Sequence, residues 1–237
     1  MSELSALRRV GHKGADHIAP GNTAASFDAA LAHGVDMIEF DVLPEDMQDR
    51  AGSRLLLAHD YDHDLSAALT LEQGLSHLAS SPFTSVELDV DLKLPGYEDR
   101  VVEALRAHGL VDRTLVSSTF MRSLVAVRAL EPRLRIGWSV PRARRDYTAS
   151  RLWMLPAYAM VARIRRRLPA AARSHLAAGR CDAIMAHWRL VSAELVRAVS
   201  AAGGELYVWT VDDAARIRAL EAMGVTGVIT NDPRLFG

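Results

Sequence analysis

Short apolar runs alternate along the chain with segments whose apolar residues recur every three or four positions. Short apolar or alternating runs are typical of β-strands, and the longer periodic segments are typical of α-helices. The runs predict strands at residues 8–12, 37–43, 55–59, 86–93, 114–118, 135–140, 183–186, 205–210 and 227–230. The periodic segments predict helices at residues 23–33, 98–108, 121–130, 192–202 and 212–223.

The alternation of strands and helices favours a parallel sheet, and with this many units the closed form is a TIM (β/α)8 barrel. The predicted strands are one too many for such a barrel. The polar linker at residues 44–54 is shorter than a parallel crossover usually needs. We therefore interpret residues 55–59 as the return arm of an extra hairpin after strand 2, outside the barrel. This hairpin would carry His59 over the barrel mouth.

Composition bounds the class of protein. The 237 residues, 49% of them hydrophobic, predict a single domain over residues 1–237 with a large core. The formal net charge of −1 gives no overall field that would attract nucleic acid or an anionic membrane. The single cysteine, Cys181, excludes an intrachain disulfide and fits a cytoplasmic location. We expect no signal peptide, and the longest apolar stretch, 152–162, is too short to span a bilayer. No sequence pattern indicates an oligomeric state.

The longest stretch without a predicted strand, residues 141–180, is rich in arginine. An arginine tract at 163–167 directly follows the apolar run at 152–162. A basic amphipathic helix can lie on a lipid surface, so membrane contact through residues 151–180 is one interpretation. The more common interpretation is an outer helix of the barrel with a solvated, arginine-rich face.

Two acidic residues stand two positions apart in the predicted strand at 37–43, namely Glu39 and Asp41. In an extended strand, residues i and i+2 point to the same face, so these carboxylates project together, about 7 Å apart. They repel each other unless a cation lies between them. A solvated strand face is the alternative interpretation, but the apolar flanking residues give this strand little reason to be wet. The pattern predicts a site for a hard cation.

The other reactive side chains fall at the carboxyl ends of predicted strands, where a TIM barrel forms its active site. His12 ends the first strand, and Asp91 and Lys93 end the strand at 86–93. Alternation places Asp89 on the same face as Asp91. We expect Asp91 to be the third metal ligand because it lies nearer the mouth, with Asp89 as the alternative. A cation site flanked by the imidazoles of His12 and His59 is typical of phosphodiesterase chemistry.

An ordered set of motifs extends over nearly the whole chain. The motifs are Gly11-His12-Lys13-Gly14, Pro20-Gly21-Asn22-Thr23, Ile38-Glu39-Phe40-Asp41-Val42, His59-Asp60, Asp91-Leu92-Lys93, Val208-Trp209-Thr210-Val211 and Val228-Ile229-Thr230-Asn231-Asp232. They resemble, in the same order, the His-Arg-Gly, Pro-Glu-Asn-Thr, Ile-Glu-x-Asp-Val, His-Asp, Glu-x-Lys, Trp-Thr-Val and Ile-Thr-Asp motifs of the glycerophosphodiester phosphodiesterase family. Each motif alone is weak, but the ordered set is specific.

The resemblance implies a barrel that binds a divalent cation, Ca²⁺ or Mg²⁺, through Glu39, Asp41 and Asp91. Oxygen-only ligands suit such hard cations and disfavour zinc. The resemblance also implies that His12 and His59 are the general base and general acid, in an order that the sequence leaves open.

The implied reaction is hydrolysis of a small-molecule glycerophosphodiester to glycerol 3-phosphate and an alcohol, with a glycerol hydroxyl attacking first. Lys13 and Lys93, the only lysines among 28 basic residues, would bind the phosphate. His187 follows the predicted strand at 183–186 and Trp209 ends another, so each could face the substrate or simply pack at the barrel rim. Asp60 could orient His59.

Three positions depart from the family pattern. Lys13 replaces an arginine, Gly21 replaces a glutamate, and Asp91 replaces a glutamate with a shorter side chain. Two further functions therefore stay open. The first is a phospholipase D-like lyase that acts on intact lipid and forms a cyclic phosphate, because Asp-Leu-Lys also resembles such enzymes. The second is a barrel that binds a phosphorylated ligand without catalysis.

Overall fold

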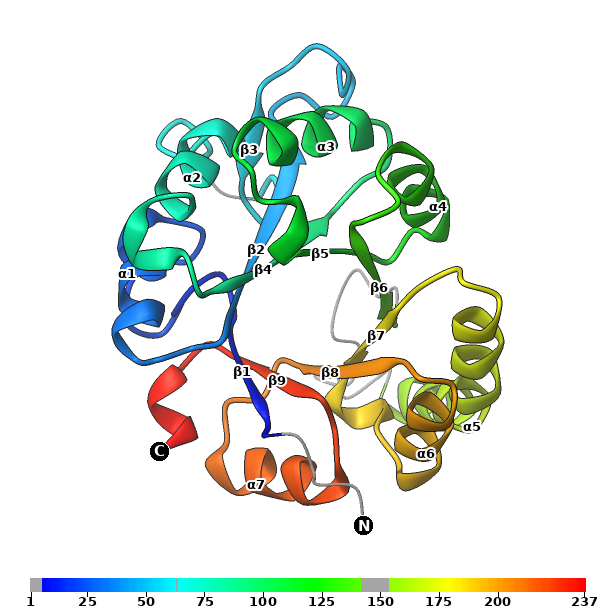
Figure 1. Ribbon diagram of the computed structural model, residues 1–237. Coiled ribbons are helices and arrows are strands. Elements are labelled where there is room, and N and C mark those ends of the chain that lie inside the picture. The colour runs from blue at the N-terminus through cyan, green and yellow to red at the C-terminus, as the bar shows by residue number, and fades with distance from the viewer. Residues whose placement is uncertain (1–5, 63, 142–153) are drawn as a thin grey trace.

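A computed structural model of the protein describes residues 6–62, 64–141 and 154–237. Eight parallel strands form a closed barrel, and helices cover its outside (Figure 1). The strands are β1 (Arg8–Gly11), β2 (Met37–Pro44), β4 (Glu87–Leu92), β5 (Thr114–Ser118), β6 (Arg135–Val140), β7 (Ala183–His187), β8 (Glu205–Trp209) and β9 (Gly227–Thr230). Pairing of β1 with both β2 and β9 closes the sheet. The predicted TIM barrel is confirmed.

The outer helices connect successive strands. They are α1 (Ala24–Ala32), α2 (Leu71–Leu78), α3 (Glu98–Ala107), α4 (Met121–Leu130), α5 (Met154–Ala177), α6 (Ala193–Ala201) and α7 (Ala214–Met223). The five helices predicted from periodicity correspond to α1, α3, α4, α6 and α7. The long α5 is the outer helix expected within the arginine-rich stretch, and residues 142–153 lie outside the described part of the chain.

The extra hairpin is also confirmed. Strand β3 (Leu55–Leu57) runs antiparallel to the end of β2, with Pro44 opposite Leu55, and it pairs with no other strand in the described residues. It ends two residues earlier than the pattern predicts, so His59 lies in the loop beyond it. The Tyr61 hydroxyl donates a hydrogen bond to the Pro44 carbonyl at 2.5 Å, which ties this loop to the end of β2.

Helix α2 has no counterpart among the predicted helices. Thr70 caps it, and Gln73 completes a capping box with the Thr70 backbone. A glycine in the middle, Gly74, weakens the helical signal in the sequence. Packing requires glycine at this position, because a Cβ at residue 74 would lie 2.5 Å from Leu57 Cδ2 of β3. The glycine lets the helix approach the hairpin closely.

Side-chain alternation on the strands divides the core into two parts. In β2, Ile38 and Phe40 point outward into the layer between barrel and helices. Met37 points inward, with Leu115, Met185 and other interior side chains. Glu39 and Asp41 share the inward face with Met37, because strand residues alternate. The fold therefore aims both carboxylates into the barrel.

No helix in the described part of the chain is long and apolar enough to cross a membrane.

Cys181 provides a test of the fold. Burial raises the pKa of its thiol from 9.0 to about 12. We expect the native protein not to react with a thiol reagent at about pH 8, and the unfolded protein to react at once. The folded thiol stays protonated at pH values where the unfolded thiol ionises. Stability should therefore fall as pH rises above about 9. Reaction kinetics with and without denaturant measure the first effect, and fast labelling of the native protein would contradict it.

Candidate active site

Three carboxylates converge at the carboxyl ends of β2 and β4. Asp41 and Asp91 are opposite each other in the parallel pairing, and Glu39 is opposite Asp89 one inward position earlier. One oxygen from each of Glu39, Asp41 and Asp91 lies within 4.8 Å of the other two. The sequence placed these three acids in one cluster, and the structure brings them together.

Lys93 lies at the centre of this cluster. Its Nζ is 2.6 Å from Asp41 Oδ1 and 2.6 Å from Asp91 Oδ2. Burial raises the pKa of Asp41, but the Lys93 ammonium, His59 and His12 outweigh burial and leave that pKa below its usual value. Burial and the Asp41 charge raise the pKa of Glu39 well above its usual value. Lys93 is one ammonium beside three carboxyl groups. Ionisation of all three is therefore disfavoured unless further positive charge is present.

Asn22 fixes the position of Asp41, a role that the sequence did not reveal. Its Nδ2 donates to Asp41 Oδ2 at 3.0 Å, and its Oδ1 accepts from the Asp41 backbone N–H at 3.1 Å. Asn22 is buried and has a φ of 59°, a conformation that asparagine tolerates better than most residues. The next residue, Thr23, caps α1, so the Asn22-Thr23 pair joins the cap to the site.

His12 follows β1 and is held in one orientation by Asn231. Its Nδ1 lies 2.5 Å from Asn231 Oδ1. Asp212 accepts from both the backbone N–H and the Nδ2 of Asn231, which leaves Oδ1 to accept from His12. His12 Nδ1 therefore carries the proton, and Nε2 is the free acceptor, 3.9 Å from Glu39 Oε2. Burial lowers the pKa of His12, so the neutral ring is favoured near pH 7.

His59 approaches the cavity from the hairpin loop, as the sequence predicted. Its side chain is 51% exposed, and Nδ1 lies 2.9 Å from Asp60 Oδ2. Asp60 thus orients the ring, which bears out the suggestion from the sequence. Both residues line the cavity at the barrel mouth.

The three acids on the inward face of β4 have different partners. Glu87, at the amino end, pairs with Arg8 at 2.9 Å and with Arg135. Asp91 pairs with Lys93 at the mouth. Asp89, between them, is 1% exposed and its Oδ1 accepts no hydrogen bond. Burial raises the pKa of Asp89 to about 8, so it is mostly neutral at pH 7. Asp91, and not Asp89, has a carboxylate oxygen close enough to those of Glu39 and Asp41 to share a metal ion with them.

A cavity of about 580 Å³ opens at the mouth above the acidic cluster. Trp209 and Lys93 line it, together with apolar side chains that include Leu43, Met47 and Phe120. Trp209 donates a hydrogen bond from Nε1 to the Met185 carbonyl at 2.8 Å, which fixes the indole. No local pattern predicts this apolar wall, because its residues are far apart in the chain: Leu43 lies near the end of β2, Met47 lies in the hairpin, and Phe120 precedes α4.

Lys13 and His187 are not among the described residues that line the cavity. Lys13 Nζ lies 3.5 Å from Asp16 Oδ2, and the Lys13 backbone N–H donates to Glu39 at 2.9 Å. His187 packs against Trp209, with ring centroids 5.2 Å apart. In this conformation Lys13 supports Glu39 through its backbone and His187 supports Trp209.

Gly21, where the family has glutamate, sits beside Asp16. The Gly21 N–H donates to Asp16 Oδ1 at 2.8 Å, and a Cβ on Gly21 would lie 2.6 Å from that oxygen. The Asp16 carboxylate therefore fills the space that a side chain at position 21 would need.

The acidic cluster fits a divalent cation. Its donors are all carboxylate oxygens, which hard cations prefer. Asp41 Oδ1 is buried and accepts no well-aligned hydrogen bond, although the Lys93 ammonium lies beside it. A buried carboxylate oxygen with an unused acceptor position is a suitable ligand atom.

A barrel whose mouth gathers acids and two imidazoles belongs to the class of barrel hydrolases that cleave phosphate esters. Comparison with known proteins narrows this class. The model of the glycerophosphoryl diester phosphodiesterase family matches residues 12–43 and 63–235. The chain belongs to this family, and it is a phosphoric diester hydrolase.

Individual relatives agree with this assignment. A glycerophosphodiester phosphodiesterase of Caldanaerobacter subterraneus is 24% identical over 259 residues, which cover 94% of this chain and 93% of the relative. One from Bacillus subtilis is 24% identical and covers 96% of this chain and 84% of the relative.

Solved structures share the fold. A glycerophosphodiester phosphodiesterase of Parabacteroides distasonis superposes with a TM-score of 0.73 at 17% identity, covering 96% of this chain and 94% of that one. A phosphodiesterase of Oleispira antarctica, solved in complex with the product sn-glycerol-3-phosphate, gives a TM-score of 0.67 at 20% identity, covering 96% and 94%.

Proposed function

We propose that the protein hydrolyses a glycerophosphodiester to glycerol 3-phosphate and an alcohol, with a divalent cation, Ca²⁺ or Mg²⁺, held by Glu39, Asp41 and Asp91. The convergence of these three carboxylates within 4.8 Å carries the proposal. A phosphodiester is an anion, and an anion approaching three carboxylates is repelled unless further positive charge is present. A bound divalent cation would hold a phosphate oxygen and offset the charge that develops during the reaction.

His12 is the proposed general base. Its neutral form is favoured by burial, and Asn231 keeps the proton on Nδ1. Nε2 is then available to take the proton from the attacking hydroxyl, either a glycerol hydroxyl of the substrate or water. The resulting imidazolium would be stabilised by the nearby Asp41 charge.

His59 is the proposed general acid. It lies on the exposed side of the cavity, where the leaving alcohol can depart into solvent. As the bond from phosphorus to the alcohol oxygen breaks, His59 would donate a proton to that oxygen. Asp60 would hold the ring in position during the transfer.

Lys93 and Trp209 are the proposed substrate-binding residues within the cavity. Once a divalent cation binds the carboxylates that now pair with Lys93, the Lys93 ammonium could bind the phosphate. Lys13 and His187 stay predictions as direct contacts, since substrate binding would have to move Lys13 away from Asp16.

Release of glycerol 3-phosphate from glycerophosphocholine or glycerophosphoethanolamine tests the proposal. We expect turnover by pure protein with Ca²⁺ or Mg²⁺, loss of turnover in a chelator, and recovery when the cation is restored. A coupled glycerol 3-phosphate dehydrogenase assay measures it. Turnover that a chelator leaves unchanged would contradict the metal site.

The lyase alternative has its own signature. Phosphorus NMR of the products would show a cyclic phosphate from an intact lysophospholipid and no glycerol 3-phosphate. Ligand binding measured by calorimetry, without any product from either substrate, would instead favour a non-catalytic barrel.

A further inference from the structure

Helix α5 concentrates positive charge in a chain that is otherwise acidic. Residues 141–180 contain ten of the 28 basic residues and one of the 29 acidic ones. Within α5 itself there is no acidic residue, and there are five arginines: Arg163, Arg165, Arg166, Arg167 and Arg173. The net charge of −1 therefore hides a strongly uneven distribution.

All five arginines are exposed, and none forms an ion pair within the described part of the chain. Several arginines elsewhere have acidic partners, among them Arg106 with Glu131 at 2.9 Å. Arg163 lies three and four positions from Arg166 and Arg167, so these like charges are neighbours on the helix and repel each other. A surface of unpaired, mutually repelling cations gains energy from an anionic partner.

The helical period places most of these arginines on one face. Leu168 and Ala172 are buried against the barrel. Arg163, Arg166 and Arg173 lie on the opposite side, because the α-helix advances about 100° per residue. They form a stripe that runs for about 15 Å along the solvent side of the helix.

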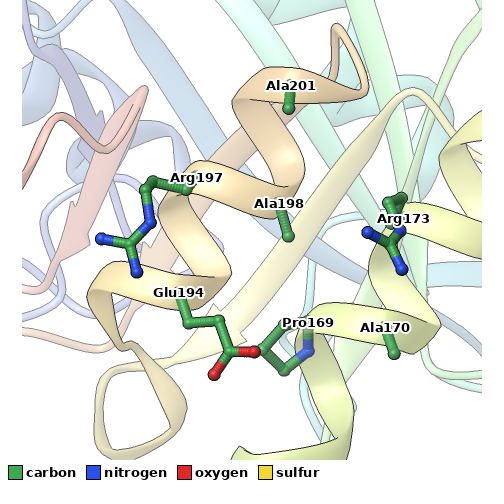
Figure 2. Close-up of a pocket in the computed structure, with 7 residues that line it drawn as sticks. All are labelled: Pro169, Ala170, Arg173, Glu194, Arg197, Ala198 and Ala201. Atoms are coloured by element: carbon green, nitrogen blue, oxygen red, sulfur yellow. The ribbon is translucent and has the colours of Figure 1, made fainter.

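Helix α6 extends this basic surface. Arg173 of α5 and Arg197 of α6 flank a shallow cavity of about 290 Å³, and Glu194 is the one acid that lines it (Figure 2). The remaining lining residues are Pro169, Ala170, Ala198 and Ala201. Small side chains leave both guanidinium groups accessible from solvent. We call Arg197 and the five arginines of α5 the α5 surface.

Helix α5 reaches the rim of the barrel mouth. Helix α5 packs against the short 3₁₀ helix Trp188–Leu190, which directly follows β7 at the mouth. Trp188 lies there beneath Arg216, 3.9 Å from the guanidinium carbon to the ring centroid. Toward the amino end of α5, Met160 is 48% exposed. An aromatic ring and a cation thus lie at the rim that α5 contacts, and an exposed apolar side chain lies on α5 itself.

We propose that the α5 surface docks the protein on a bilayer of anionic phospholipid. Arginines attract the negative surface of such a bilayer, and an adjacent apolar residue can enter its interface. Nucleic acid would also attract the arginines, but it offers no apolar environment for the exposed side chain of Met160. Charge complementarity and apolar exposure together favour lipid.

Flotation with unilamellar vesicles tests the proposal. We expect binding to vesicles that contain phosphatidylglycerol, weak or no binding to pure phosphatidylcholine, and loss of binding at high salt. The double variant R163Q/R167Q should lower the partition coefficient about 30-fold, since each arginine near the surface contributes about a factor of five. Circular dichroism and hydrolysis of soluble glycerophosphocholine should be unchanged.

The matched control is R9Q/R218Q, which removes the same charge from two exposed arginines outside the α5 surface. It should bind anionic vesicles like the parent. Equal weakening by both double variants would show general charge attraction and overturn the proposal. So would absence of vesicle binding by the parent, including the case in which duplex DNA binds instead. Each of these results leaves hydrolysis of soluble substrate intact, so they are distinct from failure of the proposed reaction.

Discussion

Replacing His12 by alanine is expected to lower kcat/KM for glycerophosphocholine by roughly 10²–10⁴-fold, the range for loss of a positioned acid–base group. The loss should appear mainly in kcat, because His12 acts on the proton of the nucleophile and does not hold the substrate. Among the described residues of the site, this half-buried ring is the one imidazole that is fixed by a hydrogen-bonded chain, through Asn231 to Asp212.

Two further variants sharpen this test. Asn231→Ala should free the His12 ring and its tautomer and cause a smaller loss than removal of the imidazole. His33→Ala is the matched control, because His33 is an exposed histidine at the end of α1. Steady-state kinetics at saturating divalent cation measure all three. Activity of His12→Ala close to that of the parent would exclude His12 as the base.

Much of the fold could be predicted because local pattern and topology agree. Alternating apolar runs fix which strand residues face inward, and this is why Glu39 and Asp41 could be placed together before any coordinates. The short linker after β2 likewise implied a hairpin. Helix α2 was missed because its glycine is required by contact with Leu57, and such a contact between distant residues leaves no local periodic signal.

The site was predicted less completely than the barrel. Its charged members stand in strands, but their supporting residues stand in loops. Asn22 stands in one of the motifs, but only the fold shows that it holds Asp41. Asn231 and Asp212 are separated in sequence from His12 by most of the chain. Hydrogen bonds between residues so far apart in the sequence form only when the barrel closes. The hydrophobic pattern predicts that closure but not the side-chain positions that result from it.

The hairpin that carries His59 is not part of the match to the family, although it contributes a residue to the proposed site. The family model leaves residues 44–62 unmatched, although it covers the chain on both sides. The hairpin lies outside the closed barrel, so its length can vary without opening the ring of strands. The proposed role of His59 thus depends on its position at the cavity and its contact with Asp60.

Asp41→Asn should weaken divalent cation binding by at least about 100-fold, more than the loss of a supporting second-sphere contact. The substitution keeps the shape of the side chain, and Asn22 can still hydrogen-bond to the amide oxygen. It removes one of the two carboxylate charges that lie 2.6 Å from Lys93 Nζ, however, and leaves that ammonium competing with the cation for fewer carboxylates. Calorimetric titration of the chelator-treated protein with Ca²⁺ and Mg²⁺ measures the effect.

The same variant should lose hydrolysis at cation concentrations that saturate the parent and regain part of it at much higher concentrations. Asp112→Asn is the matched control, because Asp112 is 79% exposed and pairs with Arg133 at the surface. Its cation affinity and turnover should equal those of the parent. If Asp41→Asn bound the cation as tightly as Asp112→Asn, the three acids would serve only to position Lys93, and the cation would have to bind elsewhere.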